Sequence, residues 1–355
     1  MIGKKILQHT KSIFLRGVSF VKRTGYSLRQ FAFYCRKFDA SFAFIQYREC
    51  MSGGRGYSNY FIEKTSAYMQ RVLLPITEKY KELSDPNSIP VYHKHITKVD
   101  MNGKIPVWVC WWQGEDQMPP IVKVCYQRVC RAFQNSQTKV ILITENNCTD
   151  YIDFPQYITE KYEKGLIGKA HFADLLRWGL MANYGGIWLD ATILITFDDI
   201  SKIKPQMSLP FYTQRFSGES ECPNEPSRGL WAGFYFMGGH DGDFRIFQFV
   251  YDSLLYYWER YDFALHYVFL DYIIWAGFQN IAFIQKLIDD VPPNNKHIWS
   301  LCKLMNEPYD DSKWTEMMNN GDVYKLTYKD GWKEYDDTGK ITFYGHLLQE
   351  LHNNI

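Results

Sequence analysis

The chain has 355 residues and carries 40 Lys and Arg residues against 39 Asp and Glu residues, so its formal net charge is +1 at pH 7. This balance indicates no polyanionic partner, and nucleic acid is therefore not an expected ligand. Aromatic residues are frequent, with 26 Tyr, 24 Phe and 11 Trp. Such a composition suits surfaces that stack on sugars or bases, and equally an aromatic core.

Targeting and redox signals point to the cytoplasm. No run of 18 uncharged apolar residues occurs, so a transmembrane helix is not expected. Arg16 interrupts the one candidate for the apolar region of a signal peptide. The eight cysteines are scattered and form no CxxC pair, which is typical of reduced thiols in a cytoplasmic protein.

Residues 1–100 are predicted to form a helical, basic N-terminal extension. No acidic residue precedes Asp39, whereas nine Lys and Arg residues do. On a helical wheel, the first six of these basic residues lie opposite an apolar stripe that includes Ile6, Phe14 and Phe20. This pattern is typical of a helix on an anionic membrane surface, here the inner face of the plasma membrane. The alternative is a helix that packs on the protein's own domain with a solvated basic face.

Residues 101–355 are predicted to form one α/β domain, preceded by a helix at 61–83. A strand at 105–112, a helix at 120–133 and a strand at 139–144 form a βαβ unit. Such a unit predicts a parallel sheet with ligands at the carboxyl ends of its strands. No GxGxxG motif follows the first strand, which disfavours a dinucleotide site.

The stretch at residues 169–196 is the most informative part of the sequence. It predicts a helix that ends at Gly185-Gly186, followed by a buried strand at 187–195. Asp174 and Arg177 share one side of the helix, where the ordinary interpretation is a surface ion pair.

A carboxylate lies within the predicted strand. In an uninterrupted strand, Asp190 and Thr192 would point the same way, about 6.5–7 Å apart. A lone buried carboxylate needs a cation, a hydrogen-bond donor or a metal, unless it caps a nearby loop. Together, the helix with an acid and a base, the glycine turn and the strand with a carboxylate predict a site.

The rest of the chain supplies further candidate acids and bases. Glu219 and Glu221 lie in a polar loop, and His266 and Asp271 lie on a predicted helix. The ordinary interpretation of His266 and Asp271 is that of helix residues with common hydrogen bonds. The elements expected in this part are strands at 207–213, 230–237 and 323–329 and helices at 243–260 and 265–278.

Three motifs carry a family resemblance: Trp-Trp-Gln-Gly-Glu-Asp at 111–116, Ala-His-Phe-Ala-Asp-Leu-Leu-Arg at 170–177, and Tyr-Gly-Gly-Ile-Trp-Leu-Asp-Ala-Thr at 184–192. They resemble bacterial capsular polysaccharide synthesis proteins, which are similar to glycosyltransferases that include yeast α-mannosyltransferases and clostridial glucosylating toxins. The resemblance covers roughly residues 104–345. It implies a GT-A fold, with a Rossmann-like, mostly parallel sheet flanked by helices.

The resemblance also implies a hexosyltransferase reaction. The donor would be a nucleotide-diphosphate sugar, with a UDP-sugar favoured, and the cofactor a divalent cation, Mn²⁺ or Mg²⁺. The acceptor would be a growing capsular or other surface polysaccharide, as a saccharide or a lipid-linked saccharide. The relatives just named retain the anomeric configuration, so retention is expected here.

Matching motifs assign roles to individual residues. Trp108 and the corner at 111–114 would border the nucleobase, Asp174 and Arg177 would hold the donor sugar, and Asp190 would contact the ribose and the metal. The catalytic candidates are Asp190, Arg177 and Asp271. The full expected donor site is Trp108, Trp111, Trp112, Gln113, Gly114, Asp174, Arg177, Gly185, Gly186, Asp190, Lys325 and Lys329.

The sequence departs from the DxD pattern at Thr192, which replaces a carboxylate. A hydroxyl is a weaker ligand for a hard cation than a carboxylate is. The expected metal ligands are Asp190, Thr192 and His346. Lys325 or Lys329 could instead supply positive charge to the leaving diphosphate, or be solvated lysines on an edge strand.

Two other functions stay open at this point. One is a non-catalytic subunit that keeps the sugar-nucleotide fold and scaffolds a polysaccharide assembly complex, which Thr192 favours. The other is a glycosidase, which would need two carboxylates that flank a sugar. Asp174 and Asp190 could be such a pair, but Arg177 and the glycine turn fit donor binding better.

Overall fold

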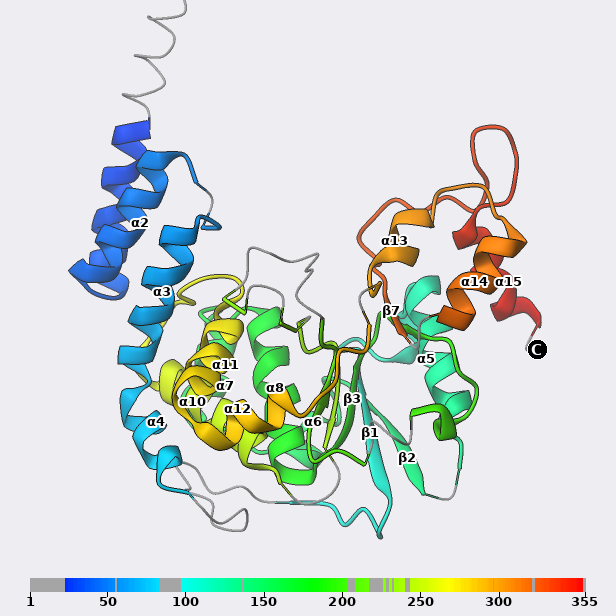
Figure 1. The fold of residues 1–355 in the computed structure, drawn as a ribbon, viewed down its shortest axis with the longest axis horizontal. Helices are drawn as coiled ribbons and strands as arrows, with labels where there is room; N and C mark the ends of the chain where they lie inside the picture. The colour runs from blue at the N-terminus through cyan, green and yellow to red at the C-terminus, as the bar shows by residue number, and fades with distance from the viewer. Residues whose placement is uncertain are drawn as a thin grey trace, which may run out of the picture.

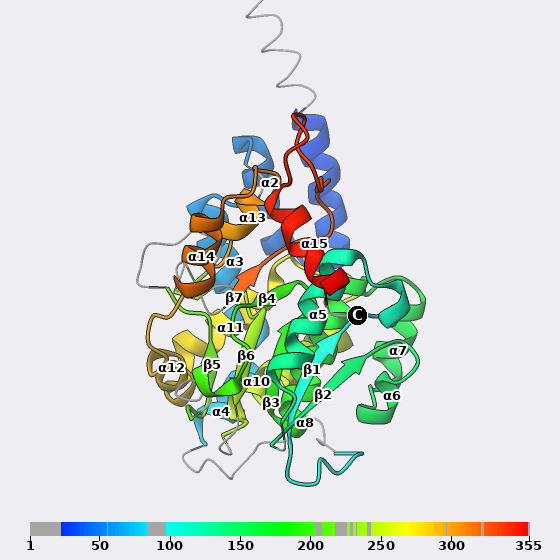
Figure 2. The same ribbon diagram turned by 90° about the vertical axis from the view of Figure 1, so that its right-hand side faces the viewer.

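The computed structural model describes residues 23–54, 56–83, 97–135, 137–203, 208–216, 226–227, 230–231, 233–239, 243–295, 297–320 and 323–353. Its central sheet is covered by helices, with N-terminal helices at one side and a small C-terminal lobe at the other (Figures 1 and 2). Most of the predicted membrane-binding segment and the loop with Glu219 and Glu221 lie outside the described residues. Among the helices within those ranges, none has the length and apolar character needed to cross a membrane.

The central sheet has five strands in the order β2-β1-β3-β6-β5. Strand β1 pairs in parallel with both β2 and β3, whereas β6 pairs antiparallel with β3 and with β5. Because β5 is antiparallel to β6, it runs in the direction of β3, and only β6 opposes the other four strands. The predicted mostly parallel sheet is confirmed. The strands are β1 (Ile105–Cys110), β2 (Thr138–Ile143), β3 (Gly186–Asp190), β5 (Tyr212–Thr213) and β6 (Phe236–Gly239).

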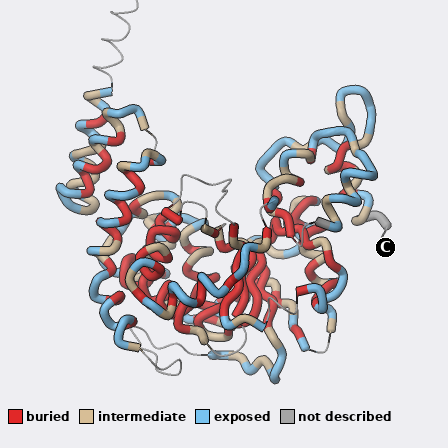
Figure 3. The backbone as a smooth tube through the Cα atoms, viewed as in Figure 1, coloured by how far each residue is buried: buried red, intermediate tan, exposed pale blue. Residues whose placement is uncertain are grey.

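Helices cover the two faces of this sheet. The βαβ unit is confirmed, since α5 connects β1 to β2 and begins at Pro120, where a missing N–H costs nothing. Figure 1 shows α8, α10 and α11 on one side of the sheet and α5 on the other, and the tube in Figure 3 is mostly buried along the strands. These helices are α5 (Pro120–Ala132), α8 (Lys169–Tyr184), α10 (Arg245–Arg260) and α11 (Phe269–Asn280).

The prediction of one continuous strand at 187–195 is wrong. Strand β3 ends at Asp190, and after a turn at 191–192 the chain enters β4 (Ile193–Ile195). Strand β4 belongs to a separate two-stranded sheet, where it pairs antiparallel with β7 (Val323–Lys325). Both halves of the run are buried, so its apolar composition could not reveal that each half pairs with a different neighbour.

The small C-terminal lobe is anchored to the βαβ unit by Arg128 of α5. Its guanidinium donates from Nε to the Glu350 carboxylate at 2.8 Å and from Nη1 to the Ile195 carbonyl at 2.9 Å. Helix α15, strand β4 and helix α5 are thereby held together, which fixes β7 beside the end of β3. The elements of this lobe after the main domain are α13 (Ser300–Leu304), α14 (Asp311–Asn320), β7 (Val323–Lys325) and α15 (Phe343–Asn353).

The N-terminal helices pack partly on the main domain. The helix predicted at 61–83 is two helices, separated at Leu73. Helix α3 contacts α11, and α4 contacts α10, where the buried Tyr80 hydroxyl donates to Asp252 at 2.8 Å. The second half of the predicted extension therefore shares the hydrophobic core of the main domain. Residues 23–37 are helical and precede α2 (Ala40–Ser52), α3 (Asn59–Val72) and α4 (Leu74–Lys81).

The remaining elements are short. They are the 3-10 helices at Glu115–Gln117 and Ile200–Ile203 and the α-helices α6 (Cys148–Tyr151), α7 (Gln156–Glu163) and α12 (Ala282–Asp289). Helix α7 contacts α10, and α12 contacts α10 and α11.

Candidate functional site

A buried charge cluster forms where β3 ends beside α8. The Arg177 guanidinium contacts the Asp174 carboxylate through Nη2, and its Nη1 lies 3.4 Å from Asp190 Oδ1. The same Nη1 donates to the Phe234 carbonyl at 2.8 Å. The side chain of Arg177 is only 10% exposed, against 17% for Asp174 and 25% for Asp190. Asp174 and Arg177 are therefore not a surface ion pair, and Arg177 connects two carboxylates.

Lys325 completes this cluster from the other sheet. Its Nζ donates to Asp190 Oδ2 at 2.9 Å and to Thr192 Oγ1 at 2.8 Å. The indole of Trp188 donates to the second oxygen, Asp190 Oδ1, at 2.9 Å. Burial raises the pKa of Asp190, but Lys325 and Arg177 outweigh burial, so this pKa stays below its ordinary value. Asp190 is thus an ionised carboxylate held by two cations.

A cavity of about 300 Å³ opens onto the cluster. It is lined by Asp174, Arg177, Asp190 and Asp271, which the sequence places on three different elements. Asp271 comes from the first turn of α11 and is 7% exposed. Burial raises its pKa to about 7, and the negative charge of Asp174 adds to this increase. The structure therefore brings the three predicted catalytic candidates, Asp190, Arg177 and Asp271, into one cavity.

The raised pKa of Asp271 predicts a pH dependence of stability. The folded protein keeps the Asp271 proton up to about pH 7, whereas the unfolded chain releases it near the ordinary value of 3.8. The folded state then binds more protons in this window, so the Asp271 contribution to the free energy of unfolding falls as the pH rises from 4 to 7. Asp271→Asn should remove that decline, and its melting temperature relative to the wild type should increase between pH 5 and pH 8. Melting curves of the wild type, Asp271→Asn and the exposed control Asp262→Asn test this, and a pH-independent difference for Asp271→Asn would contradict it.

The expected divalent-cation site does not fit the residues present. The Lys325 ammonium lies between the oxygens of Asp190 and Thr192, where a bridging metal ion would have to be. Within the described ranges, no three His, Cys, Asp or Glu side chains are grouped so that they could hold a metal. The third expected ligand, His346, lies in the C-terminal lobe, where its ring stacks on Tyr309 at 3.8 Å between centroids. Lys325 and Arg177 both contact Asp190, and Arg177 also contacts Asp174, so two cations are matched by two carboxylates and Asp190 has no bare side on which to hold a metal ion alone.

Trp108 does not border a ligand site. Its side chain is fully buried, its ring packs against Tyr151 and Tyr184, and its Nε1 donates to the Gly185 carbonyl at 3.0 Å. Because helices cover both faces of the sheet, a side chain of β1 is buried whichever way it points, and the sequence position of Trp108 does not show that it faces a ligand. Trp108 is a core residue.

The corner after β1 lies at the same edge of the sheet as Asp190. The register pairs Cys110 with Asp190, so residues 111–114 follow directly beside the cluster. Trp111 donates from Nε1 to the Gln117 carbonyl at 3.2 Å and packs against Tyr328. Trp112 and Gly114 are partly buried and Gln113 is exposed. The corner therefore lies beside the end of β3 that carries Asp190, and none of its residues is among those that line the charged cavity.

The two glycines have a structural role at the opposite end of β3. Gly185 ends α8 with φ 63°, and Gly186 opens β3 with φ 92°. A Cβ on Gly186 would lie 2.3 Å from the Pro106 carbonyl oxygen, so the close approach of β1 and β3 requires glycine there. The expected donor contact of Gly185 and Gly186 is therefore not supported by their positions.

Lys329 lies outside the cluster. It is exposed, and its Nζ lies 5.9 Å from the centroid of the Tyr328 ring. No sequence motif predicts a role for Tyr235, whose ring lies 4.6 Å from Lys325 Nζ and whose carbonyl accepts from the Asp190 backbone N–H. Trp188 could have been identified, because it precedes Asp190 by two residues in a strand and so shares its face.

The fold and the site define a class: an α/β protein with a buried charged cavity at the carboxyl end of a parallel strand. The model of the capsular polysaccharide synthesis protein family matches residues 59–347. The chain belongs to this family, as the three motifs indicated. The match begins at α3, which agrees with the packing of α3 and α4 on the main domain. No curated protein and no solved structure matches the chain.

Proposed function

We propose that the protein is a GT-A-type glycosyltransferase of capsule biosynthesis. It transfers a hexose from a nucleotide-diphosphate sugar, with a UDP-sugar favoured, to a capsular or other surface saccharide. The observation that carries this proposal is the convergence of Asp174, Arg177 and Asp190 at one cavity beside the end of β3, where Lys325 is bonded to Asp190. Membership of the capsular polysaccharide synthesis family supports it.

The charges suit the bond that has to break. Cleavage of a glycosyl–phosphate bond places negative charge on the leaving diphosphate and positive charge on the sugar. Lys325 and Arg177 offer cations for the diphosphate, and Asp174 and Asp190 offer carboxylates for the hydroxyl groups of the donor. In the account proposed here, Lys325 meets the charge of the diphosphate, so no step depends on a divalent cation.

The transfer itself conserves atoms and charge. The acceptor hydroxyl oxygen forms a bond to the anomeric carbon, and the bond to the phosphate oxygen breaks with its electron pair. The acceptor proton passes to the leaving phosphate, which is the route open to a retaining enzyme. Asp271 lines the same cavity, and a pKa of about 7 suits a group that exchanges a hydrogen-bonding proton with the substrate at neutral pH.

A second candidate is a non-catalytic subunit that retains the sugar-nucleotide fold and scaffolds an assembly complex. The observation that favours it is the contact of Lys325 with both Asp190 and Thr192. Through that contact, the charge of the Asp190 carboxylate is compensated by the Lys325 ammonium group, with no ligand required. The two candidates differ in turnover, because only the transferase releases a nucleoside diphosphate.

The test is release of nucleoside diphosphate from a panel of UDP- and GDP-sugars, with and without Mn²⁺. We expect at least one donor to be hydrolysed or transferred, and Asp190→Asn to lose at least about 100-fold in rate. Asp262→Asn, which alters an exposed carboxylate bound to Lys161, is the matched control and should leave the rate unchanged. Donor binding without turnover would favour the scaffolding subunit, and failure to bind any donor would exclude both.

A further inference from the structure

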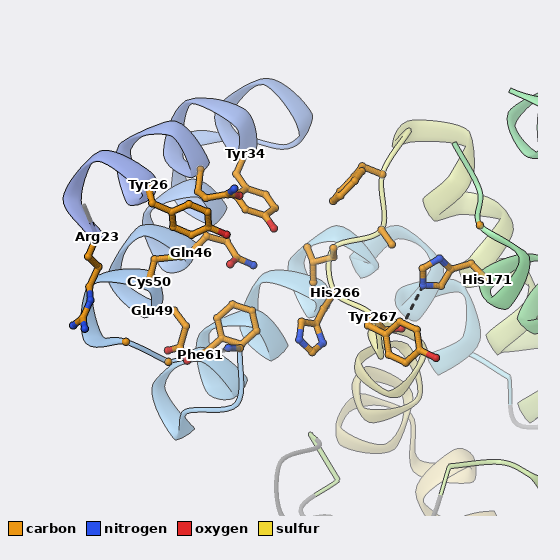
Figure 4. Close-up of a pocket in the computed structure, with 18 of the residues that line it drawn as sticks. Arg23, Tyr26, Tyr34, Gln46, Glu49, Cys50, Phe61, His171, His266 and Tyr267 are labelled. Carbon is orange, nitrogen blue, oxygen red and sulfur yellow. Dashed lines mark hydrogen bonds between the residues drawn. The ribbon is translucent and has the colours of Figure 1, made fainter. Parts of the chain in front are cut away.

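A second and larger cavity lies between the N-terminal helices and the main domain. Its volume is about 860 Å³, against about 300 Å³ for the charged cavity. One wall comes from the helix at 23–37 and from α2, and the other from residues 263–267 and the beginning of α8 (Figure 4). Ligand sites in proteins commonly measure about 300–1,000 Å³, so this cavity has room for a larger ligand than the charged cavity holds.

The two cavities are neighbours. Tyr267 lines both of them, and His171 Nε2 lies 3.3 Å from the Tyr267 carbonyl oxygen (Figure 4). His171 lines the larger cavity, whereas Asp174, three residues further along α8, lines the charged one. Three residues of helix correspond to a rise of about 4.5 Å. A ligand that extends through the larger cavity as far as Tyr267 would therefore have one end beside the charged cavity.

Exposed aromatic rings gather around this larger cavity. Tyr26, Phe263 and Tyr267 line it and are 56%, 37% and 70% exposed. Single exposed rings are common on folded proteins, but several of them gathered at one cavity are typical of a binding site. The C–H groups on one face of a sugar ring pack well on such aromatic faces.

Polar side chains between these rings are available for hydroxyl groups. The Gln46 side chain is 8% exposed and makes no hydrogen bond to another described residue. Burial lowers the pKa of His266 to about 4, so this ring is neutral at pH 7. Its Nδ1 accepts from the Val268 N–H at 3.4 Å, which leaves Nε2 as the protonated nitrogen. The Glu49 carboxylate is already occupied by Gly56 and Ser58.

We propose that this cavity binds the saccharide acceptor, whose terminal hydroxyl reaches the charged cavity past His171 and Tyr267. The inference rests on the proposed transferase function. Aromatic rings alternating with neutral amide and imidazole groups match the apolar faces and hydroxyl groups of a glycan. Among the described residues that line the cavity, Arg23 carries the only guanidinium and Glu49 the only carboxylate.

The test measures transfer to octyl glycosides of glucose, galactose, mannose and N-acetylglucosamine. In Tyr26→Ala and in Gln46→Leu, the KM for the accepted glycoside should rise at least tenfold. Hydrolysis of the donor by water reports on the charged cavity and should stay within about twofold of the wild type. Phe44→Ala is the matched control, because Phe44 is also 56% exposed but does not line the cavity. Melting temperatures confirm that each variant is folded.

The outcomes separate this inference from the proposed function. If the enzyme hydrolyses a donor but both variants transfer sugar with an unchanged KM, the acceptor assignment is overturned. It is also overturned if donor is hydrolysed and no glycoside of the panel is accepted or binds at millimolar concentration. If the wild type neither binds nor hydrolyses any donor, the transferase proposal itself fails.

Discussion

Replacement of Arg177 with methionine should destabilise the folded protein by about 3–5 kcal/mol, since removal of one partner from a buried ion pair leaves an uncompensated charge. Arg177 contacts the carboxylates of both Asp174 and Asp190 from a side chain that is 10% exposed. Without it, each carboxylate keeps the cost of burial and loses a cation. Urea denaturation at pH 7 measures the change in the free energy of unfolding.

A matched control and a rescue make the Arg177 prediction specific. Arg260 is 42% exposed and bound to the neighbouring Glu259, so Arg260→Met should cost about 1 kcal/mol or less. Adding Asp174→Asn to Arg177→Met removes one orphaned charge and should restore part of the lost stability. A loss for Arg177→Met no larger than that of the control would mean that the cluster does not stabilise the fold through Arg177.

Replacement of Lys325 with methionine should lower turnover about 100- to 1,000-fold, because removal of one preorganised donor from developing negative charge has effects of this size. Lys325 is the cation that touches both Asp190 and Thr192. Its loss should leave the protein folded, since the Lys325 side chain is 19% exposed and Arg177 still holds Asp190. Turnover of the best donor from the panel, with melting temperature as the folding control, measures the effect.

The role of Lys325 also predicts how turnover responds to metal ions. If Lys325 meets the diphosphate charge, wild-type turnover should persist in EDTA. Lys329→Met is the matched control for Lys325→Met, because Lys329 is an exposed lysine four residues away that lies beside Tyr328. Loss of wild-type turnover in EDTA with recovery in Mn²⁺ would contradict this role and restore the metal site expected from the DxD motif.

The local part of the site could be predicted from sequence. The helix carrying Asp174 and Arg177, its end at Gly185-Gly186 and the strand that ends at Asp190 follow one another within 22 residues. Periodicity and helix-stop residues act over that range. The βαβ unit and the mostly parallel sheet were predictable for the same reason.

The non-local part could not be predicted. The division of 187–195 into β3 and β4 depends on pairing with β7, which follows more than 120 residues later. That pairing brings Lys325 to Asp190. Where the sequence predicts a metal ion beside the Asp190 carboxylate, the structure has the Lys325 ammonium group. No local pattern distinguishes Lys325 from Lys329.

Sequence also does not reveal which residues are buried where both faces of an element are covered. Trp108 was expected at the nucleobase, but a tryptophan in a doubly covered strand faces one helix layer or the other, and here it is fully buried. His346 was expected at the metal, but it packs on Tyr309 and Trp314 in the C-terminal lobe. The larger cavity depends on how the N-terminal helices lie against residues 263–267, which no motif encodes.

In the proposed function, the charged cavity and the neighbouring Lys325, which is bonded to Asp190, bind the nucleotide diphosphate of the donor. Isothermal titration of UDP into the wild type, Lys325→Met and Lys329→Met, in EDTA, tests it most directly. UDP should bind the wild type and Lys329→Met with similar affinity and Lys325→Met at least tenfold more weakly. Equal affinity of all three proteins for UDP would contradict it.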